Sequence, residues 1–369
     1  MECTNPLLIQ VLPQLKPTRC GVSDQAVLLA AELKAVFGID TAFVVLNSEE
    51  RADLPYPEIH CKPAQLLESC LAHSGDRAAS LLVHVSGYGY SPDGAPTALA
   101  EALAAVKADG RFGIAAYFHE LFATGAPWRS AFWYERRQKN AVRNIARLCD
   151  LLATNTSRHA RWLEPEIANP SAASIRILPV LSAAREAASP APMAEREPSM
   201  VVFGLPPSRK RAYSDLVAHS EILTGLGIER IFDIGMEADI PDKVSGIPIS
   251  RKGRLDEAEL ATVLSRARYG FVYHAADSLA KSSIFASYCA QGTVPLIATP
   301  FTGEVDGLRD GIHLLSTRTA KTAQVSKLDR YSNAAWQWYS THGIHVHAET
   351  YAAWLKQPEL KRERVEATI

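Results

Sequence analysis

The stretch from Tyr273 to Ala298 reads YHAADSLAKSSIFASYCAQGTVPLIA, and it contributes more to the fold prediction than any other part of the chain. We interpret it as the end of a buried strand, a polar loop, a short helix that opens at Lys281, and a second strand after Gly292. The first turn of such a helix offers backbone N–H groups and the positive end of its dipole, so an anion is able to bind there. Ser282 and Ser283 are equally common as helix caps without a ligand, so both interpretations stay open.

Length and composition indicate an ordinary globular protein with two domains. The chain has 369 residues, of which 47% are hydrophobic and 21% charged, and this is too long for a single core. A net charge of −1 argues against a general nucleic-acid binder. We see no signal peptide and no apolar run near the ~20 residues of a membrane helix. Six cysteines without metal-type spacing favour reduced thiols and a cytoplasmic location.

Segments with strand and helix patterns alternate through the first half of the chain. We predict buried strands at 7–12, 41–46, 79–85, 112–118 and 151–155, with helices at 26–36, 98–107 and 130–148. Nearly continuous apolar strands separated by helices indicate a parallel sheet that is covered on both faces.

Residues 182–199 carry three prolines and no apolar periodicity, so we predict a domain linker there. A second alternating series follows, with strands at 200–204, 230–235, 270–274 and 294–298 and helices at 213–226, 257–266 and from Lys281. The prediction is therefore two doubly wound domains, 1–181 and 200–330, whose strand ends face each other across a cleft. The aromatic segment 331–369 is expected to form helices that cross back to the first domain.

Five segments carry a family resemblance. They are Gly21-Val-Ser-Asp24, Phe118-His-Glu-Leu121, Phe203 to Lys210, Gly253-Arg-Leu255 with the helix after it, and Ala290 to Ile297. Their order over nearly the whole chain resembles the GT-B glycosyltransferases, in particular the large retaining nucleotide-sugar-dependent family that includes bacterial polysaccharide transferases. The resemblance implies an α/β fold with two Rossmann-like domains, a nucleotide-sugar donor, a glycan or lipid-linked acceptor, retention, and no metal or other cofactor.

The resemblance also implies roles for the matching residues. His119 and Glu120 are expected near the reacting sugar, and Lys210 and Lys281 are expected to stabilise the departing diphosphate. The other donor-side candidates are Gly21, Ser23, Arg209, Arg254, Asp277, Ser282 and Ser283. The acceptor-side candidates are Asp24, His84, Tyr88, Tyr90 and Trp128.

Two features of the family pattern are missing. Its pair of glutamates, eight positions apart, aligns with Leu279 and Ser287, and the arginine of its phosphate segment aligns with Leu205. Neither of the first two positions offers a carboxylate for the ribose, and Asp277 is a nearby substitute. This departure motivates a second hypothesis, a non-catalytic nucleotide-sugar-binding protein of the same fold. A two-domain nucleotide-sugar epimerase is a third, although it would need more acidic residues than Glu120 and Asp277 supply.

Several candidates also have a structural interpretation. Arg209 and Lys210 fit a solvated helix start, and His119 fits a structural histidine at a strand end. Tyr88 and Tyr90 either stack on an acceptor sugar or pack within their loop. His342, His345, His347 and Glu349 have loosely metal-like spacing, but we interpret this cluster as structural because the resemblance implies no metal.

The segment 128–147 interleaves aromatic and basic residues. The aromatic ones are Trp128, Phe132, Trp133 and Tyr134, and the basic ones are Arg129, Arg136, Arg137, Lys139, Arg143 and Arg147. This pattern is typical of a helix that docks on an anionic lipid surface. A lipid-linked acceptor would require such docking, which would be a peripheral contact with the inner face of a membrane. An amphipathic helix that covers its own sheet gives the same pattern, and we favour this interpretation.

Overall fold

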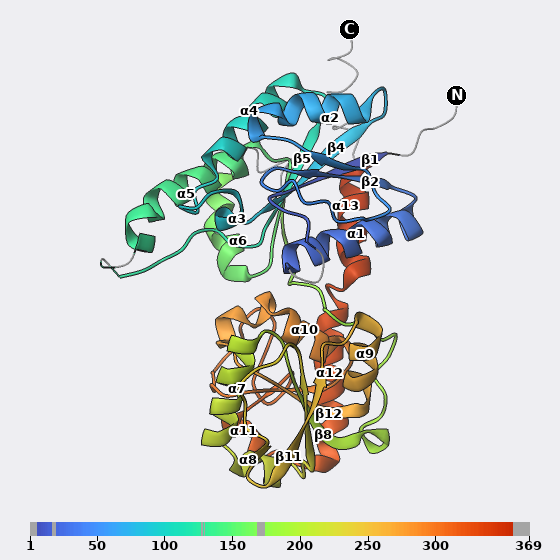
Figure 1. Cartoon of the computed structure of the whole chain (residues 1–369), viewed down its shortest axis with the longest axis vertical. Helices are drawn as coiled ribbons and strands as arrows, with labels where there is room; N and C mark the ends of the chain where they lie inside the picture. The colour runs from blue at the N-terminus through green and yellow to red at the C-terminus, as the bar shows by residue number, and fades with distance from the viewer. Residues whose placement is uncertain (1–5, 17–19, 127, 129, 168–173, 357–369) are drawn as a thin grey trace. The chain divides into compact units, whose positions relative to one another are not determined.

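The computed structural model describes residues 6–16, 20–126, 128, 130–167 and 174–356. These residues form two compact units (Figure 1). The first unit contains the chain up to Leu178 and again from Ile344, and the second runs from Pro179 to Gly343. Each unit is built on one seven-stranded sheet. The predicted class, two Rossmann-like doubly wound α/β domains, is confirmed.

The first sheet is wholly parallel and has the order β3-β2-β1-β4-β5-β6-β7. Its strands are β1 (Leu7–Leu12), β2 (Asp40–Val45), β3 (Glu58–His60), β4 (Ala79–Val85), β5 (Gly113–Phe118), β6 (Leu151–Thr154) and β7 (Ser174–Ile177). The helices are α1 (Gly21–Phe37), α2 (Leu66–Ser74), α3 (Gly87–Tyr90), α4 (Thr97–Asp109), α5 (Ser130–Leu148), α6 (Ser157–Leu163) and α13 (Ile344–Leu355). The strand order reverses between β1 and β4.

Both faces of this sheet are buried, which explains its continuous apolar strands. Successive residues of a strand point to opposite faces. Leu8 of β1 packs in a cluster with α1 and with Tyr351 of α13, whereas Ile9 packs in another cluster with Leu103 of α4 and Ile145 of α5. The helices therefore form a layer on each side of the sheet.

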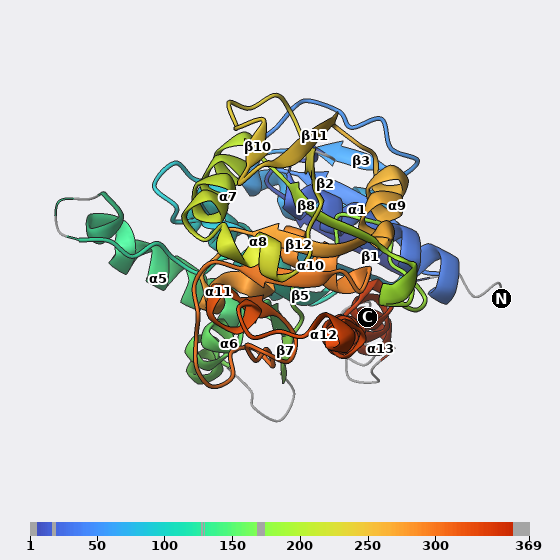
Figure 2. The same cartoon turned by 90° about the horizontal axis from the view of Figure 1, so that it is seen from below.

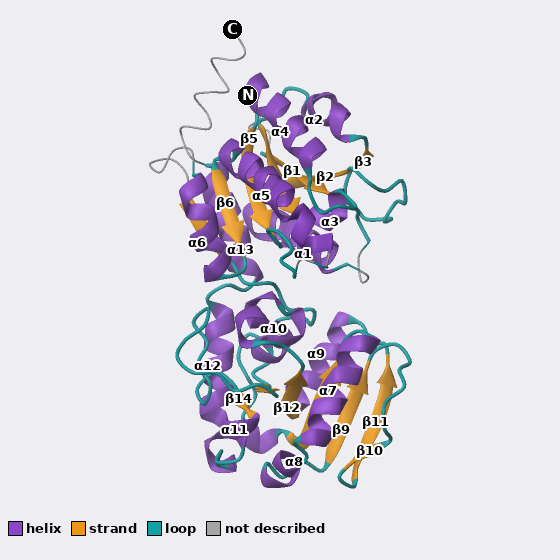
Figure 3. Ribbon diagram, turned by 90° about the vertical axis from the view of Figure 1, so that its left-hand side faces the viewer, coloured by secondary structure: helices purple, strands orange, loops and turns teal. Residues whose placement is uncertain are grey.

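The second sheet has the order β10-β11-β9-β8-β12-β13-β14, and β10 alone among these strands is antiparallel to its neighbour (Figure 3). Its strands are β8 (Glu197–Phe203), β9 (Arg230–Ile234), β10 (Lys243–Val244), β11 (Ile247–Gly253), β12 (Ala267–Val272), β13 (Val294–Ile297) and β14 (Leu315–Ser316). The helices are α7 (Pro206–Ala218), α8 (Glu221–Gly225), α9 (Glu257–Arg266), α10 (Ser283–Ala290), α11 (Thr317–Ala320) and α12 (Leu328–Ser340), and a 3-10 helix, η4 (Ala276–Lys281), precedes α10. Here the order reverses between β8 and β12.

Residues 182–199 correct the linker prediction, because they are packed against the second unit. Ala184 and Met193 lie in its apolar clusters. Arg196 is buried, and its guanidinium donates to the backbone oxygens of Ala267 at 3.1 Å and Gln291 at 2.8 Å. Burial lowers the pKa of Arg196 to about 10. The three prolines led to the prediction of an exposed linker, but the buried Arg196 fixes this segment to the second unit.

The C-terminal segment is divided between the two units. Helix α12 packs on α10 inside the second unit, and α13 packs on α1 inside the first. Residues 357–369, the end of the segment expected to cross back to the first domain, lie outside the described residues.

Gly270 of β12 lies at a close approach between the second sheet and α10. A Cβ atom there would lie 2.3 Å from Cδ1 of Tyr288, whose hydroxyl donates to the backbone oxygens of Val201 and Phe271 at 2.9 and 3.1 Å. We therefore expect Gly270→Ala to lower the free energy of unfolding by about 1–3 kcal/mol, measured by urea denaturation. Gly225→Ala in α8 is the control, because its Cβ would meet no heavy atom within 4 Å. Equal urea midpoints for the two variants would contradict this expectation.

Candidate functional site

A hollow of about 360 Å³ opens in the second unit at the carboxyl ends of three neighbouring strands. Phe203 ends β8, Val272 ends β12, and Ala298 follows β13, and all three line the hollow. The strand order reverses between β8 and β12, and open α/β sheets bind ligands outside the strand ends at such a reversal. The polar lining residues are Ser208, Arg211, Asp215, Tyr273, His274, Ser278 and Thr299. The fold therefore places a polar hollow where a ligand is expected.

Helix α7 supplies one polar wall of the hollow. Ser208, Arg211 and Asp215 are three and four residues apart, so they share one face of the helix. The helix begins with proline, which suits the first turn because the missing N–H has no intrahelical partner there. Gly204, just before it, has φ 128°, and a Cβ there would lie 2.6 Å from Cδ1 of Ile284. Glycine thus lets the turn between β8 and α7 approach α10.

Arg211 is the cation of this wall. Its guanidinium carbon lies 5.5 Å from the ring centroid of Tyr273, within the range of a cation–π interaction. The side chain is exposed and makes no ion pair within the described part of the chain. A guanidinium held in this way keeps its N–H groups available for two parallel hydrogen bonds to a phosphate.

His274 and Asp215 are the titratable groups in the hollow. Burial, followed by the positive charge of Lys281, lowers the pKa of His274 below its usual 6.5, so the ring is neutral at pH 7. Burial raises the pKa of Asp215, which supplies a carboxylate to the hollow. The sequence pattern missed Asp215, although its spacing from Arg211 on a predicted helix was a usable signal.

Arg209 corrects a prediction, because it is not available to a ligand. Its side chain is buried, forms an ion pair with Asp233, and donates to the backbone oxygen of Met236. Lys210 lies 3.4 Å from Asp239 and lines a separate hollow of about 230 Å³. Successive helical residues are rotated by about 100°, and this rotation turns Arg211, rather than Arg209 or Lys210, toward the strand ends.

The other second-unit candidates lie around the start of α10 and after β11. The hydroxyl of Ser282 accepts a hydrogen bond from the backbone N–H of Phe285 at 3.2 Å, so Ser282 caps the helix. Ser283 is its first residue. Asp277 is exposed and accepts from the hydroxyl of Ser278 at 3.1 Å. Arg254 is exposed directly after β11. The aligned glutamate positions are both structural, because Leu279 is buried in the core and the Ser287 hydroxyl donates to the backbone oxygen of Ser283 at 2.7 Å.

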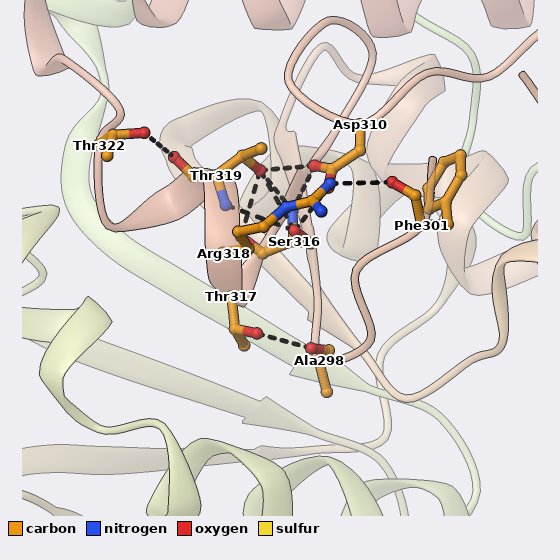
Figure 4. A network of polar contacts seen from close by, with 8 residues as sticks. All are labelled: Ala298, Phe301, Asp310, Ser316, Thr317, Arg318, Thr319 and Thr322. Atoms are coloured by element: carbon orange, nitrogen blue, oxygen red, sulfur yellow. Dashed lines mark hydrogen bonds and ion pairs between the residues drawn. The ribbon is translucent and has the colours of Figure 1, made fainter. Parts of the chain in front are cut away.

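The loop after β13 is fixed by a polar network around Asp310 (Figure 4). The Asp310 carboxylate accepts from the hydroxyls of Ser316 at 2.6 Å and Thr319 at 2.5 Å. Thr317 donates its hydroxyl to the backbone oxygen of Ala298 at 2.7 Å. The side of the hollow formed by Ala298 is therefore tied to α11.

In the first unit, three buried polar side chains are linked by hydrogen bonds that cross from β1 to β4, where the strand order reverses. Gln10 of β1 donates its Nε2 to the backbone oxygen of Ala26 at 3.0 Å, which leaves its Oε1 to accept from Nε2 of His84 at 2.8 Å. Nδ1 of His84 lies 3.1 Å from Nε2 of His119. A neutral His84 that donates from Nε2 accepts at Nδ1, so His119 must donate from its Nε2. Gln10 and His84 thus set the tautomer of His119.

Asn155 holds the backbone beside these three side chains, because its Nδ2 donates to the backbone oxygen of His119 at 2.9 Å. The sequence pattern selected His84 and His119 but missed Gln10 and Asn155. A glutamine inside an apolar strand was the signal for Gln10.

The buried His84 makes stability depend on pH. Burial and, to a smaller extent, the charge of His347 lower the pKa of His84 to about 3, whereas an unfolded histidine has a pKa of about 6.5. At a pH between these two pKa values, His84 is protonated in the unfolded chain but not in the folded protein. The free energy of unfolding therefore falls as the pH falls below about 6.5. We expect His84 to lower the free energy of unfolding by about 2 kcal/mol when the pH falls from 7 to 5. Urea denaturation of the parent and of His84→Gln at both pH values measures this contribution. If the stability of the two proteins depended equally on pH, the expectation would be contradicted.

The remaining first-unit candidates have mixed positions. Ser23 is structural, since its hydroxyl donates to the backbone oxygen of Gln14 at 3.1 Å and accepts from the N–H of Lys16 at 2.9 Å. Tyr90 donates to the backbone oxygen of Val11 at 3.1 Å, as loop packing requires. Gly21 begins α1, and Asp24 lies in its first turn. Glu120 and Trp128 are exposed. Tyr88 is half-exposed, and its hydroxyl accepts a hydrogen bond from Gln138 at 3.2 Å.

No group of three or more His, Cys, Asp or Glu side chains within the described ranges is arranged to hold a metal ion. His345 pairs instead with Glu32 at 3.1 Å and stacks on Phe37. Among the helices in the described ranges, none has the length and apolar character of a membrane span.

Comparison with known proteins shows the fold. No family model and no curated protein matches the sequence, but solved structures match nearly the whole chain. An alpha-glucosyltransferase in complex with UDP matches with a TM-score of 0.59 and 11% identity over 96% of this chain and 100% of its own. The E. coli trehalose-6-phosphate synthase, bound with UDP-2-fluoro glucose, matches with a TM-score of 0.59 and 11% identity over 95% of this chain and 99% of its own. The chain has the GT-B fold.

A third GT-B match is a putative UDP-N-acetylglucosamine 2-epimerase from Listeria monocytogenes, with a TM-score of 0.57 and 12% identity over 96% of both chains. Transferases and an epimerase thus share this fold, so the fold alone does not choose between the two activities. The chemistry has to be argued from the residues at the strand ends.

Proposed function

We propose that this GT-B protein is a glycosyltransferase of the hexosyltransferase type. It moves a sugar from a nucleotide-diphosphate sugar to a glycan or lipid-linked acceptor, with retention, in the cytoplasm, during the synthesis of cell-surface polysaccharide or glycoconjugate. The observation that carries the proposal is the polar hollow at the ends of β8, β12 and β13, with Arg211 on its wall. Its volume of about 360 Å³ lies in the range of small-ligand sites.

The chemistry of transfer fits the charges at this site. The oxygen of the acceptor hydroxyl bonds to the anomeric carbon while the bond from that carbon to the diphosphate oxygen breaks. Negative charge builds up on the departing diphosphate, which takes up the hydroxyl proton. Arg211 is placed to hydrogen-bond that charge, and Lys281 adds a second positive charge beside His274. Preorganised cations of this kind stabilise the transition state without a metal, so we propose that the reaction needs none.

The buried hydrogen bonds from Gln10 through His84 to His119 support a role for His119 in sugar recognition. Because His119 donates from Nε2 to His84, its Nδ1 is an acceptor when the ring is neutral. We propose that His119, in the tautomer that His84 sets, takes part in recognition of the sugar, with Glu120 next to it in the sequence. Gln10 and His84 act through His119 and are positioning residues.

A donor panel tests the proposed function. The purified protein is incubated with UDP-, GDP-, ADP- and dTDP-sugars without acceptor, and release of the nucleoside diphosphate is followed by mass spectrometry. We expect slow hydrolysis of one donor, unchanged by EDTA. Neither binding nor turnover with any donor would refute the proposal.

The second candidate is a non-catalytic nucleotide-sugar-binding protein of the same fold. It is favoured by Leu279 and Ser287, because both aligned glutamate positions are buried and committed to structural contacts. Binding of one donor with no release of diphosphate, even with a broad acceptor panel, would select this candidate. Conversion of a nucleotide-sugar to an isomer of equal mass would instead select an epimerase.

A further inference from the structure

Helix α5 has two halves with different environments. Its second half covers the first sheet, because Val142, Ile145 and Ala146 are buried in the core cluster on that face. Its first half extends beyond the rest of the first unit, as both views show (Figures 1 and 2). The two interpretations of the sequence pattern therefore apply to different halves of one helix.

The projecting half exposes three aromatic side chains, and a fourth is exposed just before it. Trp128, just before the helix, is 84% exposed and Trp133 is 72% exposed, and Phe132 and Tyr134 are each more than 40% exposed. Large apolar side chains that gather in this way on a surface mark an interaction site, whereas single exposed residues do not.

Cationic groups lie among these aromatics. Trp133, Arg136, Arg137 and Asn140 share one face of α5 and line a hollow of about 430 Å³ with the start of α4. The nearby carboxylates are already paired, Glu135 with Lys139 at 2.6 Å and Asp93 with Arg137 at 2.8 Å. Arg136 is exposed and has no ion pair within the described residues. The surface is therefore aromatic with a net positive charge.

We propose that the α5 surface, defined as Trp128, Phe132, Trp133, Tyr134, Arg136 and Arg137, docks on an anionic lipid bilayer. Tryptophan and tyrosine prefer the interface between headgroups and acyl chains, because one part of the ring is apolar and another is polar. The arginines lie within the same stretch and bind lipid phosphates. The proposal depends on this surface alone and not on the nucleotide site.

The charges of the α5 surface favour a bilayer over other partners. A two-fold dimer formed through this face would bring two copies of a surface with net positive charge together, and like charges would repel. Nucleic-acid sites usually need a longer basic stripe, and the chain carries a net charge of −1. An anionic bilayer matches both the aromatic and the cationic part.

Vesicle co-sedimentation tests the proposal with the full chain. We expect binding to vesicles of phosphatidylcholine with phosphatidylglycerol, weaker binding to phosphatidylcholine alone, and a loss of affinity at high salt. Trp128→Ser/Trp133→Ser and, separately, Arg136→Glu/Arg137→Glu should each reduce the bound fraction by roughly tenfold. Lys243→Glu/Lys327→Glu is the control, because it makes the same change of charge at exposed positions of the second unit.

Three results would overturn the proposal. The first is equal vesicle binding by the parent and both α5 variants. The second is a concentration-dependent dimer that Trp133→Ser abolishes, which would assign the surface to a second copy. The third is single-stranded DNA binding that depends on the same residues while vesicles are ignored. Because the substituted side chains are exposed, far-UV circular dichroism should match the parent, and Trp133→Ser alone serves as a milder variant.

Discussion

Arg211→Met should weaken the binding of UDP, or of whichever nucleoside diphosphate the donor panel selects, by about 10- to 100-fold. The reason is the loss of charge-assisted hydrogen bonds to the diphosphate, each contributing about 1.5–3 kcal/mol. Arg211 lines the hollow at the strand ends, and its guanidinium is positioned by the ring of Tyr273. Isothermal titration calorimetry with parent and variant measures the effect directly.

Lys210→Met is the matched control for this prediction. Lys210 is the adjacent residue of α7, but it lies near Asp239 and lines a different hollow. We expect it to leave nucleotide affinity within a factor of about two, since surface ion pairs contribute little. If Lys210→Met lost binding and Arg211→Met kept it, the assignment of the phosphate site would be wrong.

Arg209→Met should lower the free energy of unfolding by about 3–5 kcal/mol. Arg209 and Asp233 are both buried, and the substitution leaves the carboxylate of Asp233 without its cationic partner in the core. It also removes the donor to the backbone oxygen of Met236, which holds the loop after β9. Urea denaturation followed by circular dichroism gives the difference from the parent.

A double variant separates the buried charge from the lost packing. Arg209→Met/Asp233→Leu removes both charges, and buried ion pairs replaced by apolar residues often recover the stability. We expect the double variant to be more stable than Arg209→Met alone. A single variant as stable as the parent would show that Arg209 is not a structural cation.

Hydrophobic periodicity predicted most of the fold. The boundaries of β1, β4, α5 and α9 agree with the predicted segments, because apolar patterning there directly reflects burial against the sheets. Short or peripheral elements such as β3 and β7 were missed because they carry little pattern. The linker prediction at 182–199 failed because composition does not reveal that Arg196 is buried among backbone oxygens.

The candidate site was less predictable than the fold. The basic run at 209–211 was recognised, but only the rotation of α7 decides that Arg209 turns into the core and Arg211 toward the strand ends. Asp215 was overlooked because a family pattern directed attention to Leu279 and Ser287. The position of His119 followed from its place at a strand end, whereas its tautomer depends on Gln10, which lies more than a hundred residues earlier.

A crystal structure of the protein with the nucleoside diphosphate that the donor panel selects tests the central claim most directly. We expect the nucleotide in the hollow at the ends of β8, β12 and β13, with its diphosphate hydrogen-bonded to the guanidinium of Arg211. A nucleotide bound beside Lys210 in the smaller hollow, or elsewhere with Arg211 making no contact to it, would contradict the account.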